Sequence, residues 1–300
     1  MSDTPYRGRF APTPSGPLHF GSLLAALASF LDARQQGGTW MLRMEDLDQP
    51  RVQPGAADSI LRTLEHYNLY WDGDIRWQSQ HLPHYQGILQ GLLDCGLAFV
   101  CDCSRSQLST TNGIYDGHCR DRKLGNTADR AVRLRVDNAE TGFTDRLQGP
   151  FSQHLEADVG DFVIRRRDGI IAYQLAVVAD DIQQQINQVV RGADLLDSTP
   201  RQLWLYQKLD ARPPHYLHIP LAMRSDGNKL SKRLGSPPLS DKGAAQTLFL
   251  ALQVLQQAPP AEAQGTPVSE LLEWAVRHWN PHRLPACTQL PADILPTHLA

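Results

Sequence analysis

The N-terminal part of the chain changes from an apolar strand pattern to a helical apolar stripe. Residues 6–11 predict a strand, which Pro12 and Pro14 end because proline has no N–H for a β-ladder. Ser22 is the expected N-cap of the helix that follows. The apolar face of this helix consists of Leu23, Leu24, Leu27, Phe30 and Leu31. This order of strand, loop and helix is typical of an α/β fold.

The same alternation continues along the chain. Strands are expected at residues 39–44, 131–136, 161–164 and 188–194, and helices around 57–64, 88–93, 248–255 and 272–279. In the strand at 131–136, apolar side chains are expected to face inward and Arg133 and Arg135 outward. Such an arginine face, like the run at 165–167, is either solvated or lies against an RNA backbone.

Composition narrows the class of protein. Hydrophobic residues make up 41% of the 300 residues and charged residues 20%, which indicates a globular chain. The net charge of −3 argues against a general basic coat, so any contact with nucleic acid must use local patches. No apolar run approaches the roughly 20 residues of a membrane span, and the N-terminus has no signal-peptide pattern. Five cysteines, an odd number, favour a reducing cytoplasm and a metal over disulfides.

Two stretches carry candidate binding groups at the ends of expected strands. His19 and Gly21 lie where a loop enters a helix N-terminus, a place that attracts anions through free N–H groups and the helix dipole. Glu45, Asp46 and Asp48 follow the strand at 39–44. A carboxylate at that sheet edge could hold an amino group by a charge-assisted hydrogen bond. The alternative is a solvated acidic loop.

Three of the cysteines form a candidate metal site. Cys101 and Cys103 are a Cys-x-Cys pair and Cys119 follows them, which favours a tetrahedral zinc site of structural type. From residue chemistry alone His118 is the expected fourth ligand, because Cys₃His is an ordinary structural set. The alternative is a group of unbound thiols in a core.

A second short motif changes the interpretation of the first. Lys229 and Lys232, three residues apart before Arg233, could together neutralise a triphosphate as pyrophosphate leaves. The strings His19-Phe-Gly-Ser22 and Lys229-Leu-Ser-Lys-Arg233 together resemble the two signatures of class I aminoacyl-tRNA synthetases. The preceding Arg9-Phe-Ala-Pro-Thr-Pro-Ser-Gly is similar to the glutamate branch of that family. The stretches at 45–51, 169–181 and 188–194 also resemble this branch.

The resemblance implies an α/β fold with a Rossmann-type catalytic core in two halves, residues 1–98 and 161–240. A zinc-containing insertion at 99–160 would cradle RNA, and residues 241–300 would form a small helical region. ATP, with Mg²⁺, would bind at His19, Gly21, Ser22, Lys229 and Lys232, with His19 and Lys232 catalytic. Glutamate would bind at Arg9, Phe10, Ala11, Pro12, Thr13, Glu45, Tyr173 and Arg191. Two arginines and a glutamate complement its two carboxylates and its ammonium.

The resemblance also bears on the zinc ligands and on the RNA partner. In one branch of the family the fourth zinc ligand is a tyrosine, which here is Tyr115, with His118 as the rival. Only a short stretch follows Lys232, so no anticodon-binding domain is expected. That branch transfers glutamate, activated as glutamyl-adenylate, to the queuosine base in the anticodon of tRNA(Asp). The alternatives are a shortened glutamyl-tRNA synthetase that charges a tRNA 3′ end, and a non-catalytic zinc-stabilised RNA-binding protein.

Overall fold

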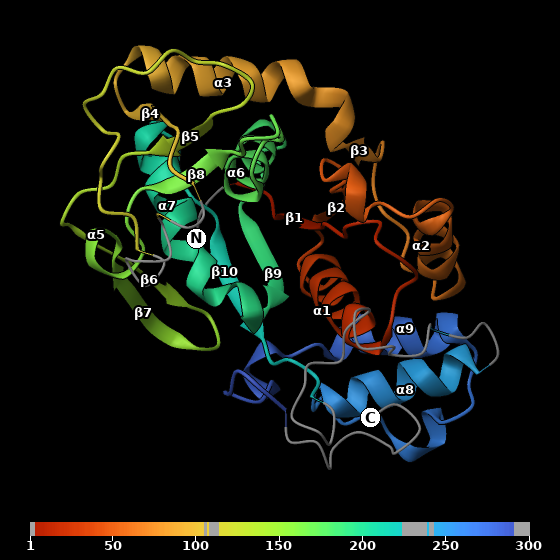
Figure 1. Cartoon of the computed structure of the whole chain (residues 1–300). Coiled ribbons are helices and arrows are strands. Elements are labelled where there is room, and N and C mark those ends of the chain that lie inside the picture. Colours follow the sequence, from red (N-terminus) through yellow and green to blue (C-terminus); the bar gives the residue numbers. More distant parts are fainter. Residues whose placement is uncertain (1–3, 105–106, 108–113, 224–238, 240–242, 291–300) are drawn as a thin grey trace.

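The computed structural model describes residues 4–104, 107, 114–223, 239 and 243–290 (Figure 1). Parallel strands run through its centre. β1 (Arg7–Phe10) pairs with β2 (Thr39–Met44), which pairs with the short β3 (Arg76–Trp77). β9 (Gln188–Gly192) pairs in parallel with β10 (His215–Ile219). The Asn187 N–H donates to the carbonyl of Arg7, which joins the starts of β9 and β1.

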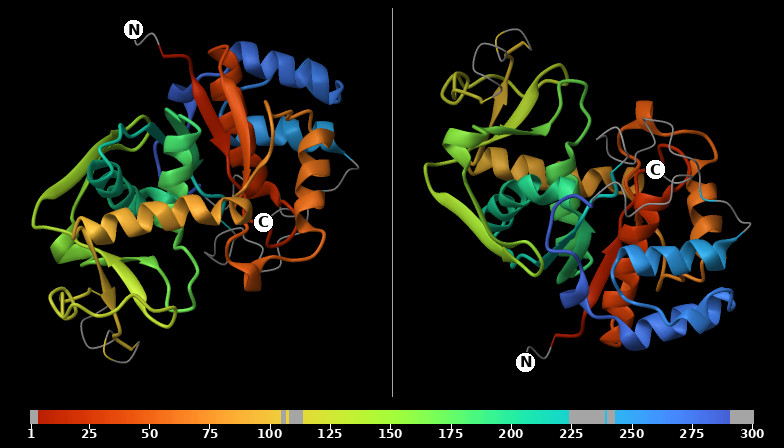
Figure 2. Two further views of the ribbon diagram at one scale, coloured as in Figure 1. Left: turned by 90° about the horizontal axis from the view of Figure 1, so that it is seen from above. Right: turned by 90° about the horizontal axis from the view of Figure 1, so that it is seen from below.

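The expected helices and strands are confirmed within a few residues of their predicted bounds. Around the first strands lie α1 (Phe20–Gln35), α2 (Ala56–His66) and α3 (Leu82–Asp94). In the second half are α6 (Tyr173–Gln183) and α7 (Thr199–Lys208). α8 (Ala244–Val254) and α9 (Val268–His278) pack on α1, on the side away from the insertion (Figure 2). No helix of the described ranges is long and apolar enough to cross a membrane.

Antiparallel strands make up the segment between the two halves. β4 (Ala98–Cys101), β5 (Ala131–Leu134) and β8 (Phe162–Arg165) form one sheet. β6 (Glu140–Asp145) and β7 (Gly149–His154) form a hairpin, and the short α5 (Leu155–Asp158) follows. The strand expected at 161–164 therefore pairs inside the antiparallel sheet rather than with the parallel strands. The four domain boundaries given above stay a prediction.

Two large apolar cores support these layers. One lies between β1, β2 and helices α1, α2, α8 and α9, and the other between α3, α6, α7 and the antiparallel sheet. The carboxyl ends of β1, β2 and β9 lead into the loop before α1, into Glu45 and into Asp194, respectively. In parallel α/β sheets, ligands collect at this edge.

Candidate active site

The loop after β1 ends at His19, which is the N-cap of α1. Its Nδ1 accepts a hydrogen bond of 3.3 Å from the backbone N–H of Ser22, and its backbone is extended. The prediction that Ser22 is the N-cap is therefore wrong. The imidazole, through Nδ1, provides the acceptor that a serine or threonine oxygen usually provides, so the helix starts earlier, at Phe20. Since Nδ1 accepts, the ring proton lies on Nε2, which makes that atom a donor.

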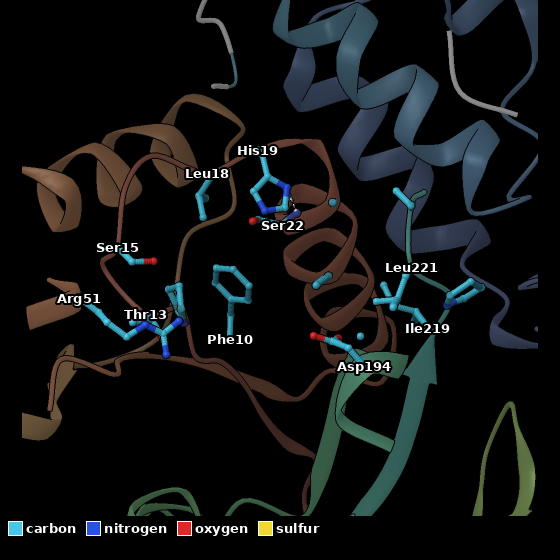
Figure 3. Close-up of a pocket in the computed structure, with 16 residues that line it drawn as sticks. Phe10, Thr13, Ser15, Leu18, His19, Ser22, Arg51, Asp194, Ile219 and Leu221 are labelled. Carbon is cyan, nitrogen blue, oxygen red and sulfur yellow. Dashed lines mark hydrogen bonds between the residues drawn. The ribbon is translucent and has the colours of Figure 1, made fainter. Parts of the chain in front are cut away.

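A cavity of about 270 Å³ lies beside this helix end (Figure 3). The end of β1 contributes Phe10, the loop contributes Pro12 and Thr13, and the helix end contributes His19, Gly21 and Ser22. Asp194 and Leu221 form part of the wall beyond β9 and β10. The cavity thus gathers the described residues that were expected to bind ATP, at a helix N-terminus suited to phosphate. It also contains Phe10 and Pro12, which were expected to bind glutamate and do not line the second cavity described below. Lys229 and Lys232 lie outside the described residues.

Gly192, at the end of β9, also lines this cavity. A Cβ built there would lie 2.6 Å from Asp194 Oδ1 and 3.1 Å from Leu221 Cδ2. Any larger residue would therefore have to displace the wall formed by those two side chains. The sequence analysis did not assign Gly192 to the site, although it follows Arg191 directly.

A second cavity of about 260 Å³ adjoins the first, since Thr13 and Arg51 line both. Its wall includes Glu45 and Asp48 from the loop after β2, and Tyr173 from the start of α6. Gln78 and Arg166 complete its polar lining. Two adjoining cavities, one with an anion-binding helix end and one with a carboxylate, match the needs of a nucleotide and an amino acid that react with each other.

Glu45 is the acidic group expected to hold an amino group, and it is not a solvated loop residue. Burial raises the pKa of its carboxyl to about 7, although Arg43 and Arg9 oppose that rise. Its Oε1 lies 3.7 Å from Nη2 of Arg43. An incoming ammonium group would stabilise the ionised form of this buried acid.

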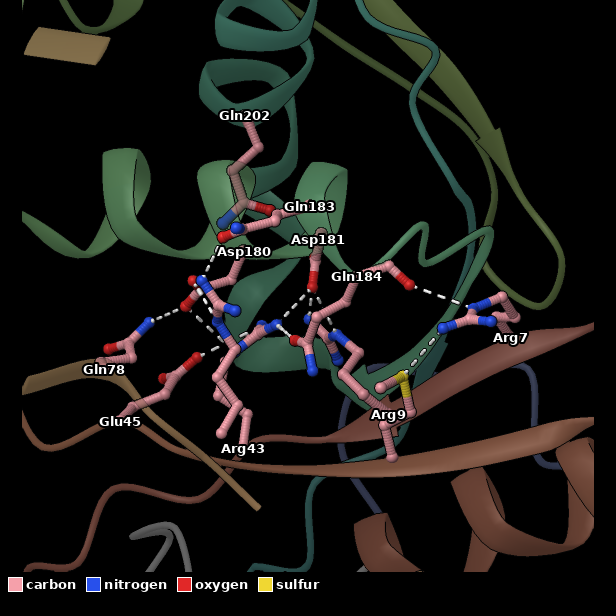
Figure 4. A network of polar contacts seen from close by, with 12 residues as sticks. Arg7, Arg9, Arg43, Glu45, Gln78, Asp180, Asp181, Gln183, Gln184 and Gln202 are labelled. Carbon is pink, nitrogen blue, oxygen red and sulfur yellow. Dashed lines mark hydrogen bonds and ion pairs between the residues drawn. The ribbon is translucent and has the colours of Figure 1, made fainter. Parts of the chain in front are cut away.

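Arg9, expected to bind glutamate, donates through Nε and Nη2 to both carboxylate oxygens of Asp181, at 3.2 and 3.5 Å (Figure 4). Arg43 donates to the same carboxylate at 2.8 Å. Arg9 and Arg43 hold the pKa of Asp181 below its usual value, although burial opposes this. The sequence analysis missed Arg43, which is fully buried two residues before Glu45. Arg9 therefore lies in the floor beneath the second cavity and does not line it.

Asp180 extends this polar floor toward the second cavity. It accepts hydrogen bonds from Arg76 Nε at 2.6 Å, Gln78 Nε2 at 2.7 Å and Tyr85 Oη at 2.9 Å. Nε and Nη2 of Arg43 have no hydrogen-bond partner among the described residues. The floor is thus a network of buried charges, and Gln78 belongs to both the network and the cavity wall.

Arg191, on β9, is also buried with protein partners. Its Nε donates to His218 Nε2 at 3.0 Å, its Nη1 to Gln202 Oε1 at 2.9 Å and its Nη2 to Thr199 Oγ1 at 2.8 Å. All three guanidinium nitrogens of Arg191 thus donate to protein groups, so in this conformation Arg191 does not offer the expected bidentate pair of donors to a substrate carboxylate. The charges of Arg191, Glu45 and Arg9 nonetheless all act on the pKa of Tyr173, which burial raises. The structure thus brings these residues together around Tyr173.

The cysteine cluster lies in the insertion, within the antiparallel sheet and the loop that follows β4. The Sγ atoms of Cys101, Cys103 and Cys119 lie within 4.8 Å of one another, and all three residues are buried. Tyr115 Oη lies 3.5 Å from the sulfur of Cys101 and 3.7 Å from that of Cys103. His118 is exposed and outside the group. Of the two residues predicted as the fourth ligand, Tyr115 therefore lies at the cluster and His118 does not, and Asp102 Oδ1 also lies 3.4 Å from Cys119 Sγ.

Arg133 is not on a solvated face, as its alternation in the strand had predicted. It is buried, and its guanidinium carbon lies 3.9 Å from the centre of the Tyr115 ring. Its Nε donates to Cys101 Sγ at 3.3 Å and its Nη1 to the carbonyl of Asp161 at 2.7 Å. The Tyr115 ring and the Cys101 sulfur lie against this guanidinium, so the face of β5 is an interior of the insertion at Arg133, whereas Arg135 stays partly exposed. Burial opposes ionisation of Cys101, but Tyr115 and Arg133 lower the pKa of its thiol overall.

Comparison with known proteins defines the class of this chain. Residues 6–244 match the family described as tRNA synthetases class I (E and Q), catalytic domain. The chain belongs to this family, and its α/β fold is the class I synthetase catalytic fold.

Comparison with individual proteins gives a more specific result than the family match. A protein from Pseudomonas aeruginosa named glutamyl-Q tRNA(Asp) synthetase is 55% identical over 97% of this chain and 99% of its own length. One of the same name from Ectopseudomonas mendocina is 56% identical over 94% of this chain and 96% of its own length. A glutamate tRNA ligase from Elizabethkingia meningosepticum, crystallised in complex with its amino acid, has a TM-score of 0.79 at 21% identity. That match covers 97% of this chain and 68% of the ligase, and it supports the fold.

Proposed function

We propose that this chain activates glutamate with ATP as glutamyl-adenylate and transfers the glutamyl group to the queuosine base in the anticodon of tRNA(Asp). The observation that carries the proposal is the 55% identity, over 97% of the chain, to a glutamyl-Q tRNA(Asp) synthetase. The pair of adjoining cavities supports it. An adenylate needs nucleotide and amino acid side by side, and Thr13 and Arg51 line both cavities.

ATP takes the first cavity in this proposal. His19 Nε2–H donates to the triphosphate, Gly21 and Ser22 offer backbone N–H groups at the helix end, and Lys229 and Lys232 neutralise the leaving pyrophosphate. His19 and Lys232 are the catalytic residues, and Mg²⁺ enters with ATP. Catalysis is then positioning and charge stabilisation, without a covalent enzyme intermediate.

Glutamate takes the second cavity. Ionised Glu45 accepts from its ammonium group, and Tyr173 and Thr13 form part of the wall. Phe10, Ala11 and Pro12 shape the loop between the two substrates. Arg9 and Arg191 supply the positive potential that favours a substrate with two carboxylates over glutamine, whose amide is neutral.

One zinc ion at Cys101, Cys103, Tyr115 and Cys119 is also part of the proposal, and the donor set fits it. The separations of 3.4 Å between Cys103 and Cys119 and 3.5 and 3.7 Å from sulfur to Tyr115 Oη resemble tetrahedron edges. Ligands about 2.3 Å from a zinc ion are about 3.8 Å apart. When bound, the ion would supply a structural crosslink in the insertion and no chemistry. These residues would hold it as thiolates and a phenolate.

The partner RNA is the anticodon stem-loop of tRNA(Asp), and the chain acts in the cytoplasm. The second cavity opens beside Arg51 and Arg166, both of which line it and are solvent-accessible. Arg51 suits a phosphate backbone brought close to the adenylate, and Arg166 would have to exchange its ion pairs with Asp48 and Asp168 for such a phosphate.

The first experiment is ATP–pyrophosphate exchange without RNA. We expect exchange with glutamate and not with glutamine or aspartate. The second uses tRNA(Asp) that carries queuosine, with the queuosine-free transcript as the matched control. Labelled glutamate should join only the modified tRNA and should stay with its anticodon fragment after nuclease cleavage. Label on the 3′-terminal fragment would identify an ordinary glutamyl-tRNA synthetase, and a lack of exchange with and without tRNA would favour a binding protein.

Zinc is tested by metal analysis of the purified protein and of two variants. The wild type should hold about one zinc ion per chain and Tyr115→Phe less, because a phenyl ring has no donor atom. His118→Ala is the control and should keep full zinc, because His118 is exposed. A wild type with less than half an equivalent would contradict the site, and loss of zinc in His118→Ala alone would reverse the ligand assignment.

A further inference from the structure

A buried chain of hydrogen bonds lies behind Arg191. Asp145, at the end of β6, is 2.6 Å from Nδ1 of His218, and His218 Nε2 is 3.0 Å from Nε of Arg191. His218 and Arg191 are register partners on β10 and β9. Asp145, His218 and Arg191 are 2%, 0% and 5% exposed, so water does not compete for these contacts.

The chemistry of the three groups fixes the direction of the chain. Arginine can only donate, so Nε2 of His218 must accept and its ring proton must lie on Nδ1. That proton is donated to Asp145. Asp145 is itself held by the backbone N–H groups of Leu147 and Gln148, each at 2.9 Å. Burial lowers the pKa of His218 to about 4, although Asp145 opposes this, so the ring is neutral at physiological pH.

The other sides of the Arg191 guanidinium are also fixed. Gln202 and Thr199 accept from Nη1 and Nη2, and the ring of Tyr216 lies 5.1 Å from the guanidinium carbon. Gln202 in turn donates through Nε2 to Oε1 of Gln174 at 2.9 Å, and Gln174 follows Tyr173, a wall residue of the second cavity, at the start of α6. Hydrogen bonds therefore connect Arg191 to the wall of that cavity.

We propose that His218 and Asp145 are positioning residues for glutamate recognition, which hold Arg191 in the orientation that the amino acid requires. The inference rests on the proposed function. It gives the β6–β7 hairpin a role in the amino-acid site, although none of its residues lines the second cavity. The competing interpretation is that the Asp145–His218 pair only anchors the hairpin to β10.

Two amide variants of His218 separate these roles. The amide of asparagine reaches the place of Nδ1, so His218→Asn can keep the contact to Asp145 and loses the acceptor for Arg191. The amide of glutamine reaches the place of Nε2, so His218→Gln restores that acceptor and loses the Asp145 contact. Tyr206→Phe is the control, because it removes a buried polar group that holds no other residue. Tyr206 is buried, and its hydroxyl has no hydrogen-bond partner among the described residues.

The KM values for glutamate and for ATP are measured by pyrophosphate exchange. We expect His218→Asn to raise the KM for glutamate about 10- to 100-fold, the effect of one lost hydrogen bond to a charged group, with the KM for ATP within about threefold. His218→Gln and Tyr206→Phe should stay within about fivefold of the wild type. The proposal is overturned if His218→Gln is the more impaired amide variant, or if both KM values rise together.

A double-mutant cycle with Arg191→Gln tests that His218 acts through Arg191. The double variant with His218→Asn should have nearly the KM for glutamate of Arg191→Gln alone, and additive effects would contradict the proposal. If a His218 variant does not fold, Asp145→Asn replaces it. An amide N–H facing Nδ1 drives the ring proton to Nε2, against Arg191, and the same selective rise in KM is expected. A wild type without glutamate exchange would instead refute the proposed function.

Discussion

The two cavities are built in different ways. The first takes most of its polar lining from one continuous stretch, from Phe10 to Ser22, and its key feature is the end of a helix. The floor of the second is assembled from β1, β2, β3, α3 and α6, with Arg9 and Asp181 in contact across 172 positions of the sequence. Local backbone geometry thus makes the nucleotide side, whereas long-range ion pairs make the amino-acid side. Mutations in the two cavities should therefore affect different properties of the protein.

The largest effect is expected for Asp181→Asn, measured as the free energy of unfolding. This carboxylate is the common acceptor of Arg9 and Arg43, and its loss leaves Arg9 without its anion and Arg43 with only the longer contacts to Glu45 and Asp180. Breaking a buried ion pair from one side costs about 3–5 kcal/mol. Chemical denaturation measures this loss in the free energy of unfolding. Asp74→Asn, in the loop between α2 and β3, is the exposed control. A loss below about 1 kcal/mol would mean that the floor does not depend on this ion pair.

The next effect is expected on the nucleotide side, for His19→Ala. Loss of the Nε2–H donor should lower kcat for pyrophosphate exchange by roughly 10²–10³, as for other single transition-state donors. Loss of the N-cap should cost only about 1 kcal/mol of stability. His19→Asn separates the two, because asparagine is a good N-cap without an imidazole. We expect it to regain stability and not turnover, and full turnover in His19→Asn would assign His19 to capping alone.

This difference also explains what the sequence could and could not predict. Periodicity and prolines located the strand, loop and helix around His19, because those signals are local. They misplaced the N-cap, since an imidazole acceptor is not among the usual capping groups. The position of Glu45 after a predicted strand made it a candidate, whereas Tyr173 came from the family resemblance, which gave no partners for Arg9 and Arg191. Asp181, Arg43 and His218 could be assigned only once distant elements were brought together.

The prediction from the alternating pattern at 131–136 was wrong for a related reason. It predicted an outward Arg133, because period-two patterns assume that one face of a strand meets water. The Tyr115 ring and the Cys101 sulfur pack against the guanidinium, so at Arg133 that face is an interior with its own acceptor. A local pattern carries no information about which other segment will pack against the face.

A smaller effect on the amino-acid side is expected for Glu45→Gln. The substrate ammonium would exchange a charge-assisted hydrogen bond for a neutral one, which raises the KM for glutamate about 10- to 100-fold. The KM for ATP should change less than about threefold, because Glu45 lines the second cavity and not the first. Folding should survive, since the variant removes a buried acid whose ionised form is already disfavoured. Equal changes in both KM values would mean that Glu45 does not act on glutamate binding alone.

The smallest effect is a pH dependence that belongs to the second cavity alone. Burial raises the pKa of Glu45 to about 7, and only its ionised form attracts an ammonium group. The ionised fraction therefore falls as pH drops through 7, and the KM for glutamate should rise, roughly tenfold between pH 7 and pH 5.5. Glu45→Gln has no proton to lose and should give a flat profile over the same range. If wild type and variant share one slope, the titrating group is elsewhere, and the burial of Glu45 does not govern recognition of the amino acid.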